Sequence, residues 1–129
     1  MSSTAHPDPL VDLLTALREQ VMGVQETVLS TADGLLVAAD ADTVHPESVA
    51  ALSAATLSLG QRLTDEAKGG VLRDITTRST ERHILIQSVG ERALLTVVGD
   101  SGLDFAALQS RIHGTVEQLL KIIEKDVPA

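Results

Sequence analysis

The stretch Thr31-Ala32-Asp33-Gly34-Leu35-Leu36-Val37 decides the fold of this 129-residue chain. Asp-Gly is typical of the two central residues of a type I′ turn, which both have positive φ and whose twist matches a two-stranded hairpin. Apolar segments flank the turn, so we predict strands over residues 24–32 and 35–39. A hairpin this early, placed between two helical patterns, excludes a helix bundle and a plain βαβ fold.

Helical patterns lie on both sides of the hairpin. Upstream, Asp8 is a predicted N-cap and Pro9 the first helical residue, and leucines at helical spacing predict a helix over residues 9–22. Downstream, Pro46 begins a second predicted helix, which a Gly-Gly pair ends near residue 68.

Three strands and a last helix follow in the second half of the chain. Apolar runs predict strands over residues 71–78, 82–89 and 92–99, and Gly90-Glu91 suits a two-residue type II′ hairpin between the last two. The final helix is predicted over residues 103–124, with a glycine in its middle. The first of these three strands is the most polar, which favours the edge of a sheet.

The resulting order, α-β-β-α-β-β-β-α, predicts an α/β (α+β) fold with a five-stranded antiparallel sheet. Helices one and three can cover one face of this sheet and helix two the other. We expect a loose N-terminal segment over residues 1–8 and a single domain over residues 9–125.

The second helix has two different apolar stripes. One stripe is made mostly of large residues: Val49, Leu52, Thr56, Leu59 and Leu63. The other is small: Ala50, Ala51, Ala54, Ala55 and Ser58. Such a helix can pack on two surfaces at once, with the small stripe allowing close approach of another backbone. The alternative is an exposed, alanine-rich helix of good intrinsic propensity.

Composition excludes several classes of function. Phe105 is the only aromatic residue, so stacking platforms for single-stranded nucleic acid are absent. The formal net charge of −8 opposes binding to phosphate backbones and to anionic membranes, and residues 1–65 carry most of it. We therefore expect no nucleic-acid partner.

The chain has no cysteine, which excludes disulfides, thiolate catalysis and Cys-based zinc sites. It has no signal-peptide pattern, and no apolar run approaches the roughly 18 residues of a membrane span. We expect a cytoplasmic protein without membrane insertion.

Motifs for catalysis are missing as well. There is no Gly-x-x-x-x-Gly-Lys-[Ser/Thr] phosphate loop and no Gly-x-Ser-x-Gly elbow, and the four histidines do not have the spacing of metal ligands. We predict no enzyme activity, no metal and no cofactor. Four arginines fall in the last three strands: Arg73, Arg78, Arg82 and Arg92. Protection of a sheet edge by charge explains them better than an arginine finger offered to a partner GTPase.

Three segments together resemble the Roadblock family, of the dynein light chain and bacterial GTPase-regulator type. They are Asp33-Gly34 with Leu35-Leu36-Val37-Ala38, the small-residue segment from Ala50 to Gly60, and Arg92-Ala93-Leu94-Leu95-Thr96-Val97-Val98. The resemblance covers residues 10–124. It implies a profilin-like sheet of order 2-1-5-4-3 and a homodimer joined through helix two and edge strand three. Bacterial members commonly accompany small Ras-like GTPases.

On this basis we expect a non-catalytic homodimeric interaction module that regulates or scaffolds a small Ras-like GTPase or an associated signalling complex. The alternative is a small-molecule sensor on the same fold. The predicted dimer interface is Ala50, Ala51, Ala54, Leu57, Ser58, Gln61, Val71, Arg73, Ile75 and Thr77. Acidic residues of the loop before helix two are predicted to meet the partner: Asp40, Asp42 and Glu47.

Overall fold

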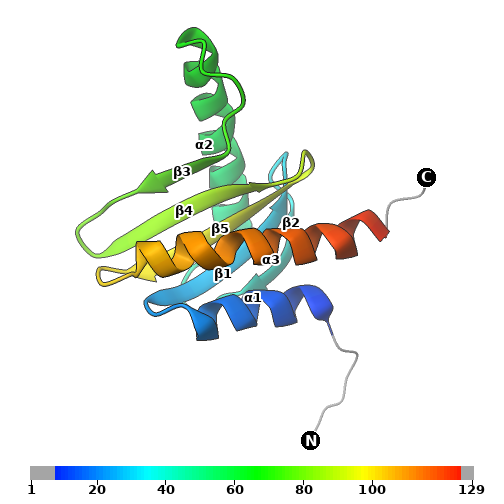
Figure 1. The fold of residues 1–129 in the computed structure, drawn as a ribbon, viewed down its shortest axis with the longest axis vertical. Helices are drawn as coiled ribbons and strands as arrows, with labels where there is room; N and C mark the ends of the chain where they lie inside the picture. The colour runs from blue at the N-terminus through cyan, green and yellow to red at the C-terminus, as the bar shows by residue number, and fades with distance from the viewer. Residues whose placement is uncertain (1–7, 126–129) are drawn as a thin grey trace, which may run out of the picture.

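The computed structural model describes residues 8–125, so the predicted loose segment lies almost entirely outside the described residues (Figure 1). The elements follow the predicted order. They are α1 (Pro9–Gln20), β1 (Val24–Thr31), β2 (Leu36–Asp40), α2 (Pro46–Glu66), β3 (Asp74–Thr77), β4 (Arg82–Val89), β5 (Ala93–Asp100) and α3 (Phe105–Lys125).

The five strands form one antiparallel sheet of order β2-β1-β5-β4-β3, which confirms the expected α+β fold. Central strands β1 and β5 pair along their whole length, with Leu29 opposite Leu95. Helices α1 and α3 cover one face, and α2 crosses the other (Figure 1). The two edges of the sheet are therefore β2 and β3.

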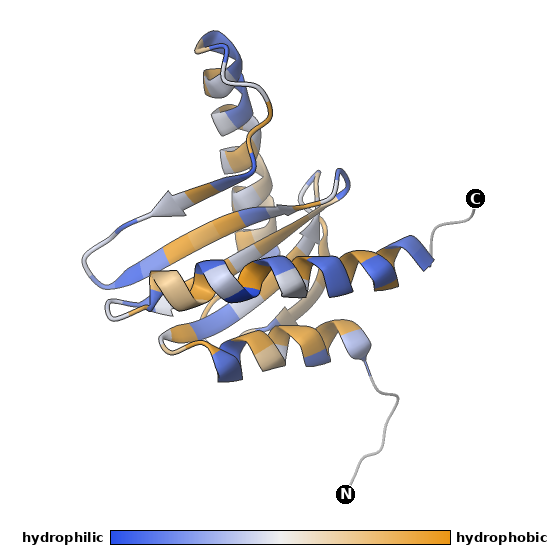
Figure 2. Cartoon of the chain, viewed as in Figure 1, coloured by the Kyte–Doolittle hydropathy of each residue, from blue (hydrophilic) through white to orange (hydrophobic). Residues whose placement is uncertain are grey.

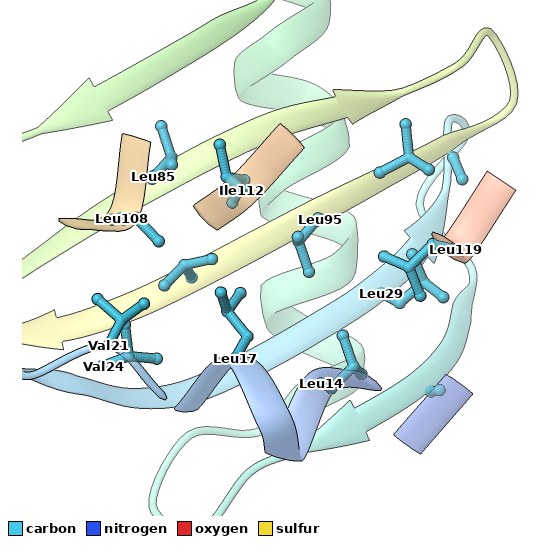
Figure 3. Packing of buried hydrophobic residues seen from close by; sticks show 14 of the residues in the cluster. Leu14, Leu17, Val21, Val24, Leu29, Leu85, Leu95, Leu108, Ile112 and Leu119 are labelled. Atoms are coloured by element: carbon cyan, nitrogen blue, oxygen red, sulfur yellow. The ribbon is translucent and has the colours of Figure 1, made fainter. Parts of the chain in front are cut away.

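The main core lies between the sheet and the α1–α3 layer (Figure 3). Leu14 and Leu17 of α1, Leu95 of β5, and Ile112 and Leu119 of α3 are at most 1% exposed. Each such side chain contributes roughly 1.5–3 kcal/mol when it is removed from water. The fully buried side chains of this layer are aliphatic, Phe105 packs against its margin, and the polar residues of α3 face away from it (Figure 2).

The hairpin between β1 and β2 differs from the predicted type I′ turn. The Gly34 N–H donates to the Thr31 carbonyl at 3.0 Å and the Thr31 N–H donates to the Leu35 carbonyl at 2.8 Å, so the loop has three residues. Only Gly34 has positive φ, at 97°, while Asp33 does not. This is the arrangement of a type I turn closed by a glycine bulge. The Thr31 hydroxyl bonds the Asp33 carboxylate, which holds the loop without a strained aspartate.

The second hairpin and β3 also differ from prediction. Gly90 has the expected positive φ, 65°, but Ala93 pairs with Val89, so this loop also has three residues. Strand β3 begins at Asp74, three residues later than predicted, and the Leu72 N–H before it donates to Gln61 of α2. The remaining helix and strand ends lie within about two residues of the predicted ones.

Candidate functional site

Helix α2 turns its small residues toward its own sheet. Ala50, Ser53 and Ala54 are at most 8% exposed. The Ser53 hydroxyl accepts a hydrogen bond of 2.7 Å from Thr96 of β5. A Cβ added to Gly34 would lie 3.2 Å from the Cα of Ala51, so the first hairpin also approaches α2 closely. Part of the small stripe is thus used for packing within the chain.

The large stripe of α2 faces away from the sheet. Leu52, Leu59 and Leu63 are 67%, 62% and 72% exposed. The C-terminal half of α2 also projects beyond the edge strand β3 (Figure 1). This half of the helix therefore offers an apolar surface that the rest of the described chain leaves uncovered. Contiguous exposed apolar surface is typical of interaction sites.

Edge strand β3 and a groove adjoin this part of α2. Among the strands of residues 8–125, β3 pairs only with β4, so within this described range its other side offers backbone N–H and C=O groups without a strand partner. A groove of about 470 Å³ runs between α2 and the β4–β5 hairpin. Its lining includes Leu57, Ser58 and Gln61 of α2 and Val71 of the following segment.

The predicted interface residues fall into two groups. Ala50 and Ala54 lie on the side of α2 that faces the sheet and are at most 8% exposed, and Ala54 also lines the groove. Other members lie on the open side of α2 or along β3 and the segment before it, where they are exposed or half-buried: Ala51, Leu57, Ser58, Gln61, Val71, Arg73, Ile75 and Thr77. Periodicity alone did not indicate that the exposed leucines belong to the same surface.

The acidic loop between β2 and α2 lies at the opposite end of α2 from the projecting half. Asp42 is exposed in this loop and Glu47 is exposed in the first turn of α2, with a Glu47 oxygen 3.8 Å from Nδ1 of His45. Asp40 instead binds Arg18 of α1 at 2.6 Å. This hydrogen bond, together with the charge of Asp40, raises the pKa of Arg18. Asp40 is thus paired within the chain at the start of the loop. Asp42 and Glu47 carry the negative charges that remain exposed.

A residue absent from the sequence analysis holds this loop in place. Glu26 of β1 is 2% exposed. Its Oε1 accepts N–H bonds from Asp42, Thr43 and Val44 at 2.6, 2.8 and 3.0 Å. Its Oε2 accepts from the Thr43 hydroxyl and, at 2.6 Å, from Arg82. The only signal in the sequence is an acid within a predicted strand.

Burial alone would raise the pKa of Glu26. The hydrogen bonds from Thr43, Val44, Asp42 and Arg82 outweigh burial and lower this pKa from 4.5 to about 2. Arg82 is consequently an internal ion-pair partner rather than the edge-protecting charge that we expected. Arg78 stacks over the Phe105 ring, with its guanidinium carbon 4.5 Å from the ring centre.

Within residues 8–125, no three His, Asp or Glu side chains lie close enough together to hold a metal ion. No helix in this described part of the chain is long and apolar enough to cross a membrane.

Comparison with known sequences gives one family. The sequence profile of the Roadblock/LC7 domain matches residues 10–99. This range begins in α1 and ends in β5, and it includes α2 and β3. No individual curated protein matches the sequence.

Comparison with solved structures gives the same fold. A Roadblock/LC7 domain from Streptomyces avermitilis superposes with a TM-score of 0.83 at 22% identity, covering 88% of this chain and 97% of that one. MglB from Myxococcus xanthus gives 0.82 at 18% identity, covering 90% and 95%. Profilin IA from Acanthamoeba castellanii gives 0.58 at 13% identity, covering 84% and 96%. The expected likeness to profilin is thereby confirmed.

Proposed function

This chain belongs to the Roadblock/LC7 domain family, and from that premise we propose that it is a homodimeric interaction module of the cytoplasm. Its role is to regulate or scaffold a small Ras-like GTPase or an associated signalling complex. Domains of this family are non-catalytic regulatory and adaptor domains, which agrees with the prediction that the chain is not an enzyme. The function must then reside in a surface.

The observation that carries the homodimer is the exposed leucine face of α2 beside a free sheet edge. A two-fold axis brings the same patch of two copies together, so one leucine face can cover another. Covering a leucine contributes roughly 1.5–3 kcal/mol. Pairing of β3 with its copy would satisfy the free backbone groups of both edges at the same time.

The GTPase partner is supported by the family resemblance and by the charge of the β2–α2 loop. Two copies of α2 would make a broad surface, and a specific complex needs about 800 Å² on each partner. Asp42 and Glu47 stand exposed at the start of each helix and would speed association with a basic partner surface.

The homodimer is tested by light scattering coupled to size exclusion at micromolar concentration. We expect the mass of two subunits for the wild type and of one subunit for Leu59→Glu/Leu63→Glu. Met22→Glu is the matched control, because Met22 is 80% exposed but lies in the turn after α1. This control should stay dimeric. A wild-type mass of one subunit would contradict the proposed homodimer.

Ser58→Arg is a second variant for the same experiment, since Ser58 is exposed on α2. It should also give monomers. Ala54→Arg cannot serve this purpose, because Ala54 is buried against the sheet and the variant would disturb folding.

The partner is tested with the purified small Ras-like GTPase encoded nearest to this gene, in its GDP-bound and GTP-bound states. Surface plasmon resonance should show binding of the dimer in at least one state. Asp42→Lys/Glu47→Lys should lower the association rate constant about tenfold while the dissociation rate changes little. If the intact dimer binds neither the GDP-bound nor the GTP-bound GTPase, the GTPase role is ruled out. The proposed homodimer is not affected by that result.

The alternative function is a small-molecule sensor, and the groove beside α2 favours it. Polar side chains of Ser58, Gln61 and Arg62 line this groove together with apolar Leu57 and Leu94. A panel of metabolites should then raise the melting temperature of the purified chain. Ser58→Arg should abolish any such shift.

A further inference from the structure

The segment between α2 and β3, residues 69–73, is a strap that holds the projecting half of α2. It makes no strand ladder with β4, although it leads directly into β3. Its outermost side chain, Val71, is 84% exposed beside the groove. The strap follows the part of α2 that lies beyond the sheet (Figure 1).

Gln61 of α2 binds the strap with both ends of its amide. Its Nε2 donates to the Gly70 carbonyl at 2.9 Å and to Oδ1 of Asp65 at 2.8 Å. Its Oε1 accepts the Leu72 N–H at 2.8 Å. Two acceptors around the nitrogen and one donor at the oxygen fix the orientation of this amide.

Packing on the same stretch of helix adds to these bonds. A Cβ added to Gly60 would lie 2.7 Å from Cδ1 of Ile75 and 2.8 Å from Cδ2 of Leu72. The absence of a side chain at Gly60 thus lets β3 and the strap approach the helix. At its other end the strap is tied to β4, because Ser88 N–H donates to the Arg73 carbonyl at 3.0 Å.

We propose that Gln61 is a positioning residue for self-association, which fixes the angle between the projecting half of α2 and edge strand β3. This inference rests on the proposed homodimer. A two-fold partner must meet Leu59, Leu63 and the β3 edge together, so these must be held in one geometry before binding. Such preorganisation raises affinity because less motion is lost on association.

Gln61 lies outside the main core, so its role can be separated from folding. The core between the sheet and α1–α3 does not include Gln61, Gly70 or Leu72. Removing the amide should free the strap and the end of α2, while the sheet keeps its packing.

The test is the dimer dissociation constant of Gln61→Met, measured by analytical ultracentrifugation. Methionine has a similar length but cannot make the amide bonds. We expect a rise of about 10- to 100-fold relative to wild type. Gln61→Glu keeps an acceptor for the Leu72 N–H but turns a carboxylate oxygen toward Asp65 and the Gly70 carbonyl, so its constant should rise at least as much as that of Gln61→Met. Gln118→Met, on the exposed side of α3, is the control and should match wild type.

Amide hydrogen exchange provides the second readout. In Gln61→Met the Leu72 N–H should exchange faster than in wild type. The β5 amides should keep wild-type protection when the two proteins are compared at the same fraction of monomer. A dissociation constant within twofold of wild type, despite faster exchange at Leu72, overturns the positioning role. A wild type that never dimerises overturns the proposed homodimer itself, so the two failures are distinct.

Discussion

The Glu26 carboxylate makes the stability of the chain depend on pH. Its pKa is about 2 in the folded chain, compared with 4.5 when unperturbed, so the unfolded chain binds the proton more readily. The stabilisation, on the order of 3 kcal/mol, is therefore complete above about pH 4.5 and is lost as pH falls toward 2. Urea unfolding of wild type between pH 7 and pH 2.5 should show this loss.

Glu26→Gln isolates the contribution of the charge. At pH 7 the variant should be about 3 kcal/mol less stable than wild type, because an amide cannot accept all five donors and pairs poorly with Arg82. The gap should narrow steadily below pH 4.5, because the unfolded wild type takes up a proton on Glu26 there and the folded wild type does so only near pH 2. A gap of the same size at pH 7 and pH 2.5 would contradict this account.

Gly114 interrupts α3 without any packing reason. A Cβ added there would meet nothing within 4 Å. Gly114→Ala should thus raise the free energy of unfolding by about 1 kcal/mol, through helix propensity alone. The matched control is Gly23→Ala, since Gly23 has φ of 94° and its added Cβ would lie 2.6 Å from the Cα of Leu103. Thermal denaturation should show a higher melting temperature for the first variant and a lower one for the second.

The local sequence pattern predicted those residues whose roles depend on their near neighbours in the chain. Gly34 and Gly90 have the positive φ that the hairpins required. Glu26 was missed because its partners lie 16 to 18 and 56 residues along the chain, and only the folded sheet brings them together. Asp40 was predicted as a free charge for a partner, but it binds Arg18, 22 residues earlier.

At the scale of elements, α2 shows what periodicity cannot decide. The sequence indicates two apolar stripes but not which one meets the sheet. Ala50 and Ala54 of the small stripe lie inward together with Ser53, because Gly34 and the Ser53–Thr96 hydrogen bond bring the helix close to the sheet. The larger stripe is left to the outside, contrary to the usual burial of leucine.

Adjacent alanines on α2 test this orientation. Ala54 is 8% exposed and would lie 3.4 Å from a Cβ at Gly34, while Ala55 is exposed. Ala54→Leu should lower the free energy of unfolding by about 1–3 kcal/mol through overpacking. Ala55→Leu should change it by less than about 0.5 kcal/mol. Equal effects at the two positions, measured by urea denaturation, would mean that α2 is rotated relative to the described structure.

For the whole molecule, the order of elements followed from pattern but the order of strands did not. Hairpins make β1 adjacent to β2, and β4 adjacent to β3 and β5. Pairing of β1 with β5 joins residues about 70 positions apart, such as Leu29 and Leu95, and no local pattern encodes it. That part of the prediction came from the family resemblance.

The net charge predicts that salt has opposite effects on two interactions of the whole molecule, the proposed homodimer and the proposed complex with a GTPase. Each copy carries −8, so two copies repel as they approach through a largely apolar surface. Salt screens this repulsion, with a Debye length of about 10 Å at 0.1 M. The proposed homodimer should therefore tighten between 0.05 and 0.5 M salt, roughly by several-fold in its dissociation constant.

Binding of the proposed GTPase should respond in the other direction. It draws on attraction between the acidic β2–α2 loop and a basic partner, so its association rate should fall over the same salt range. Ultracentrifugation of the dimer and surface plasmon resonance of the complex, in the same buffers, measure both responses. If added salt weakens the dimer as well, then charge pairs rather than the leucine face of α2 hold the two copies together. Arg62 and Asp65, which lie on the same helix as those leucines, would then be the first residues to exchange for alanine.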